Sequence, residues 1–244
     1  MTEFVVNFAG LNIEVHCHYD YTCRFCREYL TENAPDFSVS VSEEAIQEEI
    51  DISPYNPSAP YAESICAYRE MAEKFPFYDR CVFHGAVISY DGKGYIFTAP
   101  SGTGKTTHIS LWQKYLDGVE IVNGDKPVLH ITEDLVTAYA TPYAGKEGFQ
   151  NHTSAELCGI CLIEQAKENT IRRLEPSEIL MRLMGQIYRP FSAEGVVKTL
   201  ELMDKMLRRV PVYLLGCDMS EDAVRCSFEA MTGLPFDERK KDED

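Results

Sequence analysis

The sequence has no long apolar run and few basic residues. No hydrophobic segment approaches the roughly 20 residues that a membrane-spanning helix needs. Residues 1–10 contain Glu3 and Asn7, with neither a basic start nor a cleavage signal. Lys and Arg number 23 against 39 Asp and Glu, a formal net charge of -16 that repels nucleic acid and anionic membranes. We therefore expect a cytoplasmic protein with no nucleic-acid or membrane partner.

A disulfide framework and a complete zinc motif are also missing. The nine cysteines are an odd number scattered through apolar segments, which suits reduced, mostly buried thiols. His16, Cys17, His18, Cys23 and Cys26 are enough ligands for zinc, but no second C-x-x-C follows them. Strand alternation also directs Cys17 inward and both histidines outward. We expect free thiols here, with a zinc site as the alternative.

The 244 residues can form one good core or two small ones. Three prolines between Asp51 and Pro60 interrupt regular structure and mark the best boundary. We expect an N-terminal accessory α+β unit at residues 1–58, a larger domain at residues 59–236, and a charged, solvated and frayed tail at residues 237–244.

Local patterns predict the elements of the first unit. Apolar and polar residues alternate along residues 11–17, which predicts a strand paired in a hairpin with residues 4–8. A second alternating run spans residues 36–41. Ser42 and the two glutamates after it predict the N-cap of a short helix. Apolar residues then recur at helical spacing over residues 61–75, as in a helix that packs on a core.

A glycine-rich loop between a strand and a helix dominates the larger domain. Residues 95–98 are a short β-rich run, followed by small residues up to Gly104, where a helix is expected to begin. Glycines let backbone N–H groups surround phosphate oxygens, and a helix N-terminus adds its positive dipole end. The pattern G-x-x-x-x-G-K-[ST] is met at Gly104, Lys105 and Thr106, whereas Ala99 stands where the first Gly belongs. This segment predicts a P-loop that binds a nucleoside triphosphate; the alternative is a glycine-rich turn without a ligand.

The motif assigns roles to its residues. Lys105 is expected to reach the β- and γ-phosphates, and the Thr106 hydroxyl to ligate Mg²⁺. The expected cofactors are therefore a nucleoside triphosphate, which the family resemblance given below implies to be ATP, and Mg²⁺. The residues expected to contact the nucleotide form one segment: Pro100, Ser101, Gly102, Thr103, Gly104, Lys105, Thr106 and Thr107.

The strand before the loop is expected to belong to an antiparallel hairpin. Residues 81–90 are apolar on both faces except at His84, which predicts a buried strand. Residues 91–94, Asp-Gly-Lys-Gly, then turn the chain directly into residues 95–98. A loop strand paired in this way predicts a mixed sheet, because doubly wound folds join parallel neighbours through helices.

An acid follows the next predicted strand. Residues 119–122 are apolar and lead into Asn123-Gly124-Asp125. A carboxylate at a strand end beside the loop suits the second protein contact to Mg²⁺. The alternative is a plain turn, since Asn-Gly-Asp is a strong turn signal. Further strands are expected at 126–131, 135–140, 157–163 and 210–217, and helices at 179–187, 196–207 and 221–231.

The combination of His84-Gly85, the hairpin, the segment from Pro100 to Thr106, and Asp125 resembles the catalytic domain of HPr kinase/phosphorylase. Residues 101–107 also resemble the ATP loop of ATP-dependent phosphoenolpyruvate carboxykinase, which shares that fold. Residues 80–130 carry the definite motifs, and element order supports the rest. The resemblance implies a P-loop α/β fold with a mixed, largely antiparallel sheet and flanking helices. It also implies a kinase-like domain that transfers the ATP γ-phosphate to a hydroxyl of a small protein, a serine-containing peptide or a metabolite.

By the same resemblance, His84 lies near the γ-phosphate and Asp125 is one of two adjacent acids that share the roles of base and metal contact. Gly124 occupies the position of the other acid, so we expect Gly124→Asp to restore the pair. The alternative function is a nucleotide-binding switch or scaffold that has lost catalysis. Without the resemblance, His84 is a core histidine. The sequence leaves room for a homo-oligomer.

Two more cations are candidate phosphate contacts. Lys146 lies in a glycine-containing loop at residues 142–148, and Arg189 precedes a proline at a helix end. The alternative for each is a solvated surface cation. The candidate catalytic residues are therefore Asp125, His84, Lys105, Lys146 and Arg189.

Overall fold

The structure is a computed structural model that describes residues 1–100 and 102–241. The chain divides into two compact units, one formed by residues 1–80 with 189–199 and the other by residues 81–188 with the chain from 200 onward. The units therefore divide later than the expected boundary after residue 58, because α3 (Ala59–Lys74) packs on α2 (Glu43–Ile52) of the first unit. Within the described residues, no helix is both long and apolar enough to cross a bilayer.

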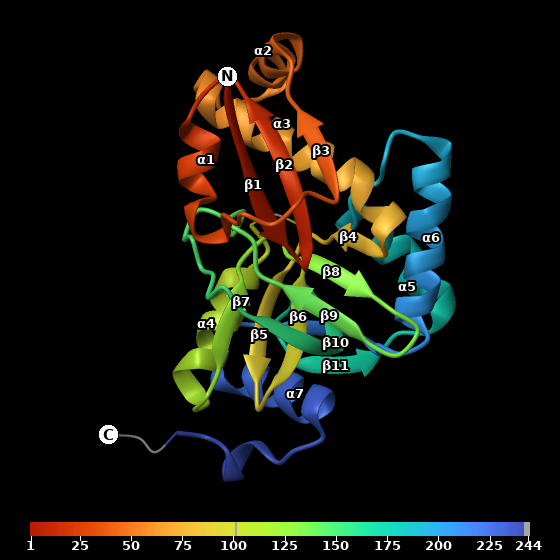
Figure 1. Ribbon diagram of the computed structural model, residues 1–244. Coiled ribbons are helices and arrows are strands. Elements are labelled where there is room, and N and C mark those ends of the chain that lie inside the picture. The colour runs from red at the N-terminus through yellow and green to blue at the C-terminus, as the bar shows by residue number, and fades with distance from the viewer. Residues whose placement is uncertain (101, 242–244) are drawn as a thin grey trace. The chain divides into compact units, whose positions relative to one another are not determined.

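The first unit is built on a small mixed sheet. β1 (Thr2–Phe8) pairs antiparallel with β2 (Leu11–Cys17) over their full length, which confirms the expected hairpin. β3 (Phe37–Ser40) adds to β2 in parallel. In Figure 1 the three strands lie side by side in red and orange.

Helices cover this sheet. The Ser42 hydroxyl accepts a hydrogen bond from the Ala45 N–H, so the predicted N-cap of α2 is confirmed. α3 carries a fully buried carboxylate, Glu63, which accepts the N–H groups of His18 (2.5 Å) and Tyr19 (3.1 Å). The short elements α1 (Tyr21–Phe25), η1 (Arg27–Tyr29) and η2 (Phe75–Tyr78) complete the unit.

The second unit is organised around a larger mixed sheet with the strand order β4-β8-β9-β10-β6-β5-β7, and with β12 between β10 and β11. β5 and β6 form the predicted antiparallel hairpin, whereas β6, β10 and β12 are successive parallel neighbours. This arrangement confirms the expected mixed α/β fold. The strands are β4 (Arg80–Val82), β5 (Ala86–Tyr90), β6 (Lys93–Thr98), β7 (Glu120–Asn123), β8 (Val128–Ile131), β9 (Val136–Tyr139), β10 (Ser154–Gln165), β11 (Thr170–Arg173) and β12 (Val212–Cys217).

Two apolar clusters cover opposite faces of this sheet. Alternate residues of β5 point to different clusters, as strand geometry requires: Val87 to one and Ile88 to the other. Ile88 packs with α4 (Lys105–Tyr115) and α7 (Glu221–Thr232), which contact each other (Figure 1). The Val87 side is covered by residues of α5 (Pro176–Leu183) and of the C-terminal half of α6 (Ala193–Leu207), with η3 (Met184–Gln186) following α5.

The expectation of one continuous strand at residues 81–90 is wrong. The strand is interrupted at Phe83, His84 and Gly85, because the backbone there pairs with the segment that follows β7. The Phe83 N–H donates to the Pro127 carbonyl (3.1 Å) and the Gly85 N–H to the Asp125 carbonyl (2.8 Å). A Cβ at Gly85 would lie 2.9 Å from Ile96, so the bend also depends on glycine. The interruption places His84 outside the regular strands.

The expected frayed tail is also wrong for residues 237–241. Arg225 of α7 holds Asp237 through two hydrogen bonds of 2.7 and 2.6 Å, within η4 (Phe236–Glu238). The Lys241 N–H donates to the Tyr115 carbonyl (2.8 Å), at the C-terminal end of α4. Ion pairs and a helix end therefore hold this charged segment, where the sequence suggested only solvation.

Candidate nucleotide-binding site

The loop between β6 and α4 has a backbone that depends on glycine. Gly102 and Gly104 have φ angles of +80° and +118°, the left-handed region that other residues rarely adopt. A Cβ at either position would meet nothing within 4 Å, so conformation and not crowding is what requires glycine. Positive φ angles at alternate residues suit a concave run of N–H groups of the kind that binds anions. Gly104 is the N-cap of α4, and Ser101 lies outside the described residues.

Lys105 folds back over this loop. Its Nζ donates to the Ala99 carbonyl (2.9 Å) and lies 3.4 Å from His84 Nε2. Burial lowers the pKa of Lys105, and the negative charge of Asp125 partly offsets that effect. The side chain of the motif lysine therefore lies at the loop; its contact with phosphate stays a prediction.

The backbone of His84 is fixed from both sides. Its N–H donates to the Gln186 carbonyl (2.6 Å), and its carbonyl accepts from the hydroxyl of Thr98 (2.7 Å), a fully buried residue at the end of β6. The imidazole is one-third exposed, with Nε2 3.3 Å from Asp125 Oδ1. When Nε2 carries a proton, it can donate to Asp125. When Nε2 carries none, it can accept a hydrogen bond from Lys105.

A side-chain-capped turn positions Asp125. The Oδ1 of the fully buried Asn123 accepts the N–H groups of Asp125 and Lys126, each at 2.9 Å, and its amide donates to the Thr141 carbonyl (2.9 Å). The turn interpretation and the site interpretation of this segment are therefore compatible. Burial alone would raise the pKa of Asp125, but the hydrogen bond with His84 and the charge of Lys126, 2.9 Å from Oδ2, lower it to about 2.

Packing explains why Gly124 carries no acid. A loop at residues 142–150 crosses it, and the Gly124 N–H donates to the Phe149 carbonyl (2.9 Å). A Cβ at Gly124 would lie 2.6 Å from the Ala144 carbonyl oxygen, closer than real Cβ contacts. The expectation that Gly124→Asp restores an acidic pair is therefore wrong, because that side chain would displace the loop backbone.

The remaining predicted residues fall into three groups. Thr106 and Thr107 lie in the first turn of α4, and Pro100 and Thr103 belong to the loop, where the Thr103 N–H donates to the Pro100 carbonyl. Lys146 is exposed in the crossing loop, next to Gly145, whose Cβ would lie 3.2 Å from that of Asp125. Arg189 belongs to the first compact unit. The contacts of all these residues with phosphate stay predictions.

Sequence reasoning missed two residues of this site. The amide of Gln165, at the end of β10, donates to the Thr103 carbonyl of the loop (3.3 Å). Lys126 forms the ion pair with Asp125. Since the carboxyl ends of parallel strands meet at one edge of a sheet, a polar residue ending the apolar run 157–163 was a usable signal for Gln165. For Lys126, the only signal in the sequence was its position directly after Asp125.

The oxygen donors of the site fit Mg²⁺. A hydroxyl at Thr106 and a carboxylate at Asp125 are hard ligands, and Mg²⁺ keeps several positions for phosphate and water. Within the described residues, no group of three or more His, Cys, Asp or Glu side chains could hold a metal by itself. Cys17, Cys23 and Cys26 are free thiols in the structure.

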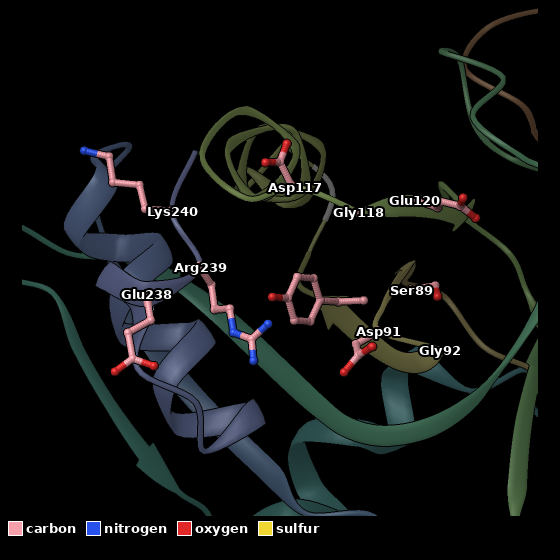
Figure 2. Close-up of a pocket in the computed structure, with 10 residues that line it drawn as sticks. Ser89, Asp91, Gly92, Asp117, Gly118, Glu120, Glu238, Arg239 and Lys240 are labelled. Atoms are coloured by element: carbon pink, nitrogen blue, oxygen red, sulfur yellow. The ribbon is translucent and has the colours of Figure 1, made fainter. Parts of the chain in front are cut away.

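A cavity of about 670 Å³ lies elsewhere, beside the turn between β5 and β6 and the C-terminal end of α4. Figure 2 shows Asp91, Asp117 and Glu120 around it, with Arg239 of the C-terminal segment. The loop is at the other end of β6 and α4. None of the described residues of the candidate site lines this cavity, so the geometry of that site depends on the loop and its neighbours.

Comparisons with known proteins give matches among solved structures, including one to a kinase. No family model matches the chain, and no curated protein matches it significantly. Among solved structures, the HPr(Ser) kinase/phosphatase from Coxiella burnetii covers 62% of this chain and 93% of its own, with a TM-score of 0.35 and 13% identity. The two chains are distantly similar in structure.

Proposed function

We propose that this protein binds a nucleoside triphosphate with Mg²⁺ at the loop of residues 99–104 and transfers the γ-phosphate to a hydroxyl group. The observation that supports this most is the convergence of three side chains beside a glycine loop that opens a helix. His84 Nε2 lies 3.4 Å from Lys105 Nζ and 3.3 Å from Asp125 Oδ1. The motif resemblance to HPr kinase/phosphorylase suggests a serine of a small protein or peptide as the acceptor, or the hydroxyl of a metabolite.

Each residue has a defined task in this proposal. Loop N–H groups and the N-terminus of α4 bind the phosphates, and Lys105 exchanges the Ala99 carbonyl for a phosphate oxygen. Thr106 and Asp125 hold Mg²⁺, which supplies charge neutralisation when bound. Lys146 is a further phosphate contact in the crossing loop.

The proton of the acceptor is proposed to pass to His84. As the hydroxyl oxygen bonds to the γ-phosphorus, the bond to the β–γ bridging oxygen breaks and the nucleoside diphosphate leaves. Asp125 Oδ1, 3.3 Å from Nε2, is placed to accept the N–H that His84 gains and so to stabilise the imidazolium. Nε2 has a hydrogen-bond partner both before and after protonation, which suits this role.

Calorimetry of Mg-ATP binding tests the loop. Lys105→Ala should weaken affinity by about tenfold or more, since it removes the charge aimed at the phosphates. The matched control is Lys114→Ala, which removes an exposed lysine near the other end of α4. Gly104→Val should also weaken binding, because valine is strained at the φ angle of Gly104. Wild-type affinity in both loop variants would contradict the proposal.

The second candidate function is a nucleotide-dependent switch or scaffold. The exclusion of an acid from position 124 favours it, because the resembled family has a second acid at that position. Incubation with γ-labelled ATP, Mg²⁺ and a host lysate separates the two functions. A phosphotransferase labels a lysate component and releases ADP, whereas a switch binds ATP and labels nothing.

A further inference from the structure

We propose that Lys126 competes with a divalent cation for the Asp125 carboxylate, and that its ammonium group moves to a phosphate when the cation takes its place. The inference rests on the proposed function and adds a regulatory residue to the same site. Access of a divalent cation to the Asp125 carboxylate then depends on the position of the Lys126 ammonium group.

Both oxygens of Asp125 are engaged by protein groups. Oδ1 faces His84 Nε2 at 3.3 Å, and Oδ2 faces Lys126 Nζ at 2.9 Å. The Asp125 side chain is only 23% exposed. A divalent cation that ligates Oδ2 would lie close to the Lys126 ammonium group, so the two positive charges compete for the same carboxylate. The His84 backbone is held by Gln186 and Thr98, whereas the Lys126 ammonium group ends a flexible stem, so Lys126 is the neighbour that can leave.

The geometry of Lys126 separates a rigid backbone from a movable side chain. Its N–H donates to Asn123 Oδ1 (2.9 Å) and to the Tyr143 carbonyl (3.1 Å), and its carbonyl accepts from the Thr141 hydroxyl (2.9 Å). The side chain is about half exposed, at 49%, and carries the ammonium on a flexible four-carbon stem. The charge can swing away from Asp125 while the turn that positions the carboxylate stays intact.

The charges around Asp125 favour movement of the Lys126 ammonium group from the carboxylate to a bound phosphate. Lys105 and Lys126 both act on Asp125, so the arrival of a divalent cation at its carboxylate places like charges close together. Lys126 is then repelled from Asp125 and attracted to a triphosphate bound at the loop. A diphosphate offers one phosphate group fewer to receive it, so the exchange should favour the triphosphate.

Binding of Mn²⁺ alone, followed by electron paramagnetic resonance without nucleotide, tests the competition. Lys126→Gln should bind Mn²⁺ about three to ten times more tightly than the wild type, the range expected for removing a partly exposed ion-pair partner and its charge. Lys126→Arg keeps a cation and should stay near the wild type. Lys114→Gln, with the same change in net charge, should also bind as the wild type does.

The double variant Lys126→Gln with Asp125→Asn locates the effect. It should lose the gain, because the carboxylate that Lys126 releases is gone. Unchanged or undetectable Mn²⁺ binding in Lys126→Gln, or a gain that persists in the double variant, would overturn the proposal. This measurement needs no ATP, so it still decides the role of Lys126 if ATP binding fails and the proposed function with it. Where ATP binds, the preference for ATP over ADP should fall several-fold in Lys126→Gln.

Discussion

Acid should destabilise the second compact unit through one buried histidine, His108 of α4. The imidazole is 3% exposed, and Nε2 lies 2.9 Å from the hydroxyl of Ser227 on α7. That hydroxyl also accepts from Trp112 Nε1 (2.9 Å), and its own hydrogen is directed to carbonyls of α7. Nε2 of His108 is therefore the protonated nitrogen. Nδ1 has no hydrogen-bond partner among the described residues, so charging the ring would place an unpaired proton in the core.

The magnitude follows from the pKa of this ring. Burial lowers the pKa of His108 from its ordinary value of 6.5 to about 4. Between those pH values the unfolded chain binds a proton that the folded protein does not, so the free energy of unfolding falls as pH falls. The contribution is fully present above pH 6.5 and is lost progressively toward pH 4. Integrated over this window, it amounts to about 3 kcal/mol, a large fraction of the stability of a typical domain.

Urea unfolding at pH 7.5 and 4.5 measures the effect, with the fluorescence of Trp112, the sole tryptophan, as the signal. The wild type should lose about 2 to 3 kcal/mol more between the two pH values than His108→Gln, which cannot titrate at this position. His152→Gln, at an exposed histidine, should keep the wild-type pH dependence. Equal pH dependence in the wild type and His108→Gln would refute the reasoning.

Three further predictions concern the site and the N-terminal thiols. Gly124→Ala should lower the free energy of unfolding by about 1–3 kcal/mol through overpacking against Ala144. The control Gly185→Ala, with open space around its Cβ, should leave the free energy of unfolding unchanged. Equal stability of the two variants would contradict the packing argument. Asp125→Asn should weaken Mg²⁺-dependent ATP affinity in calorimetry, and an unchanged Mg²⁺ dependence would remove Asp125 from the metal site. Elemental analysis should find no zinc in purified protein; one zinc per chain, lost on replacing Cys23 and Cys26 by serine, would reverse that interpretation.

Elements whose signals are local could be predicted from the sequence. The hairpin of β1 and β2 follows from alternation and its Ala-Gly turn, and the N-cap of α2 follows from Ser42. Pairing of β5 with β6 follows from the tight turn at Asp91-Gly92. The short elements α1 and β11 were not predicted, because so few residues carry no distinct period. The secondary structure of α1 and β11 therefore depends on tertiary contacts more than on local sequence.

The interruption of the strand at His84 could not be predicted from local sequence patterns. Residues 81–90 are apolar enough for one strand, yet the chain there bonds to the carbonyls of Asp125 and Pro127, which are about 40 positions away in sequence. The Gln186 carbonyl, about 100 positions away, holds the His84 N–H. The sequence singled out His84 as the polar residue of an apolar run. Only these distant partners explain why its ring lies beside Lys105 and Asp125 instead of in the core.

Position 124, where an acid was expected, also depends on a distant segment of the chain. Seen in the sequence, Gly124 is a lost catalytic residue; seen in the structure, it is the position where the loop of residues 142–150 crosses the turn before Asp125. That crossing brings Gly145 against the Asp125 side chain and binds the Lys126 N–H to the Tyr143 carbonyl. The glycine therefore allows the loop that carries Lys146 to approach the site. The packing that excludes a side chain at position 124 therefore also positions Asp125 beside the imidazole of His84 and the ammonium group of Lys126.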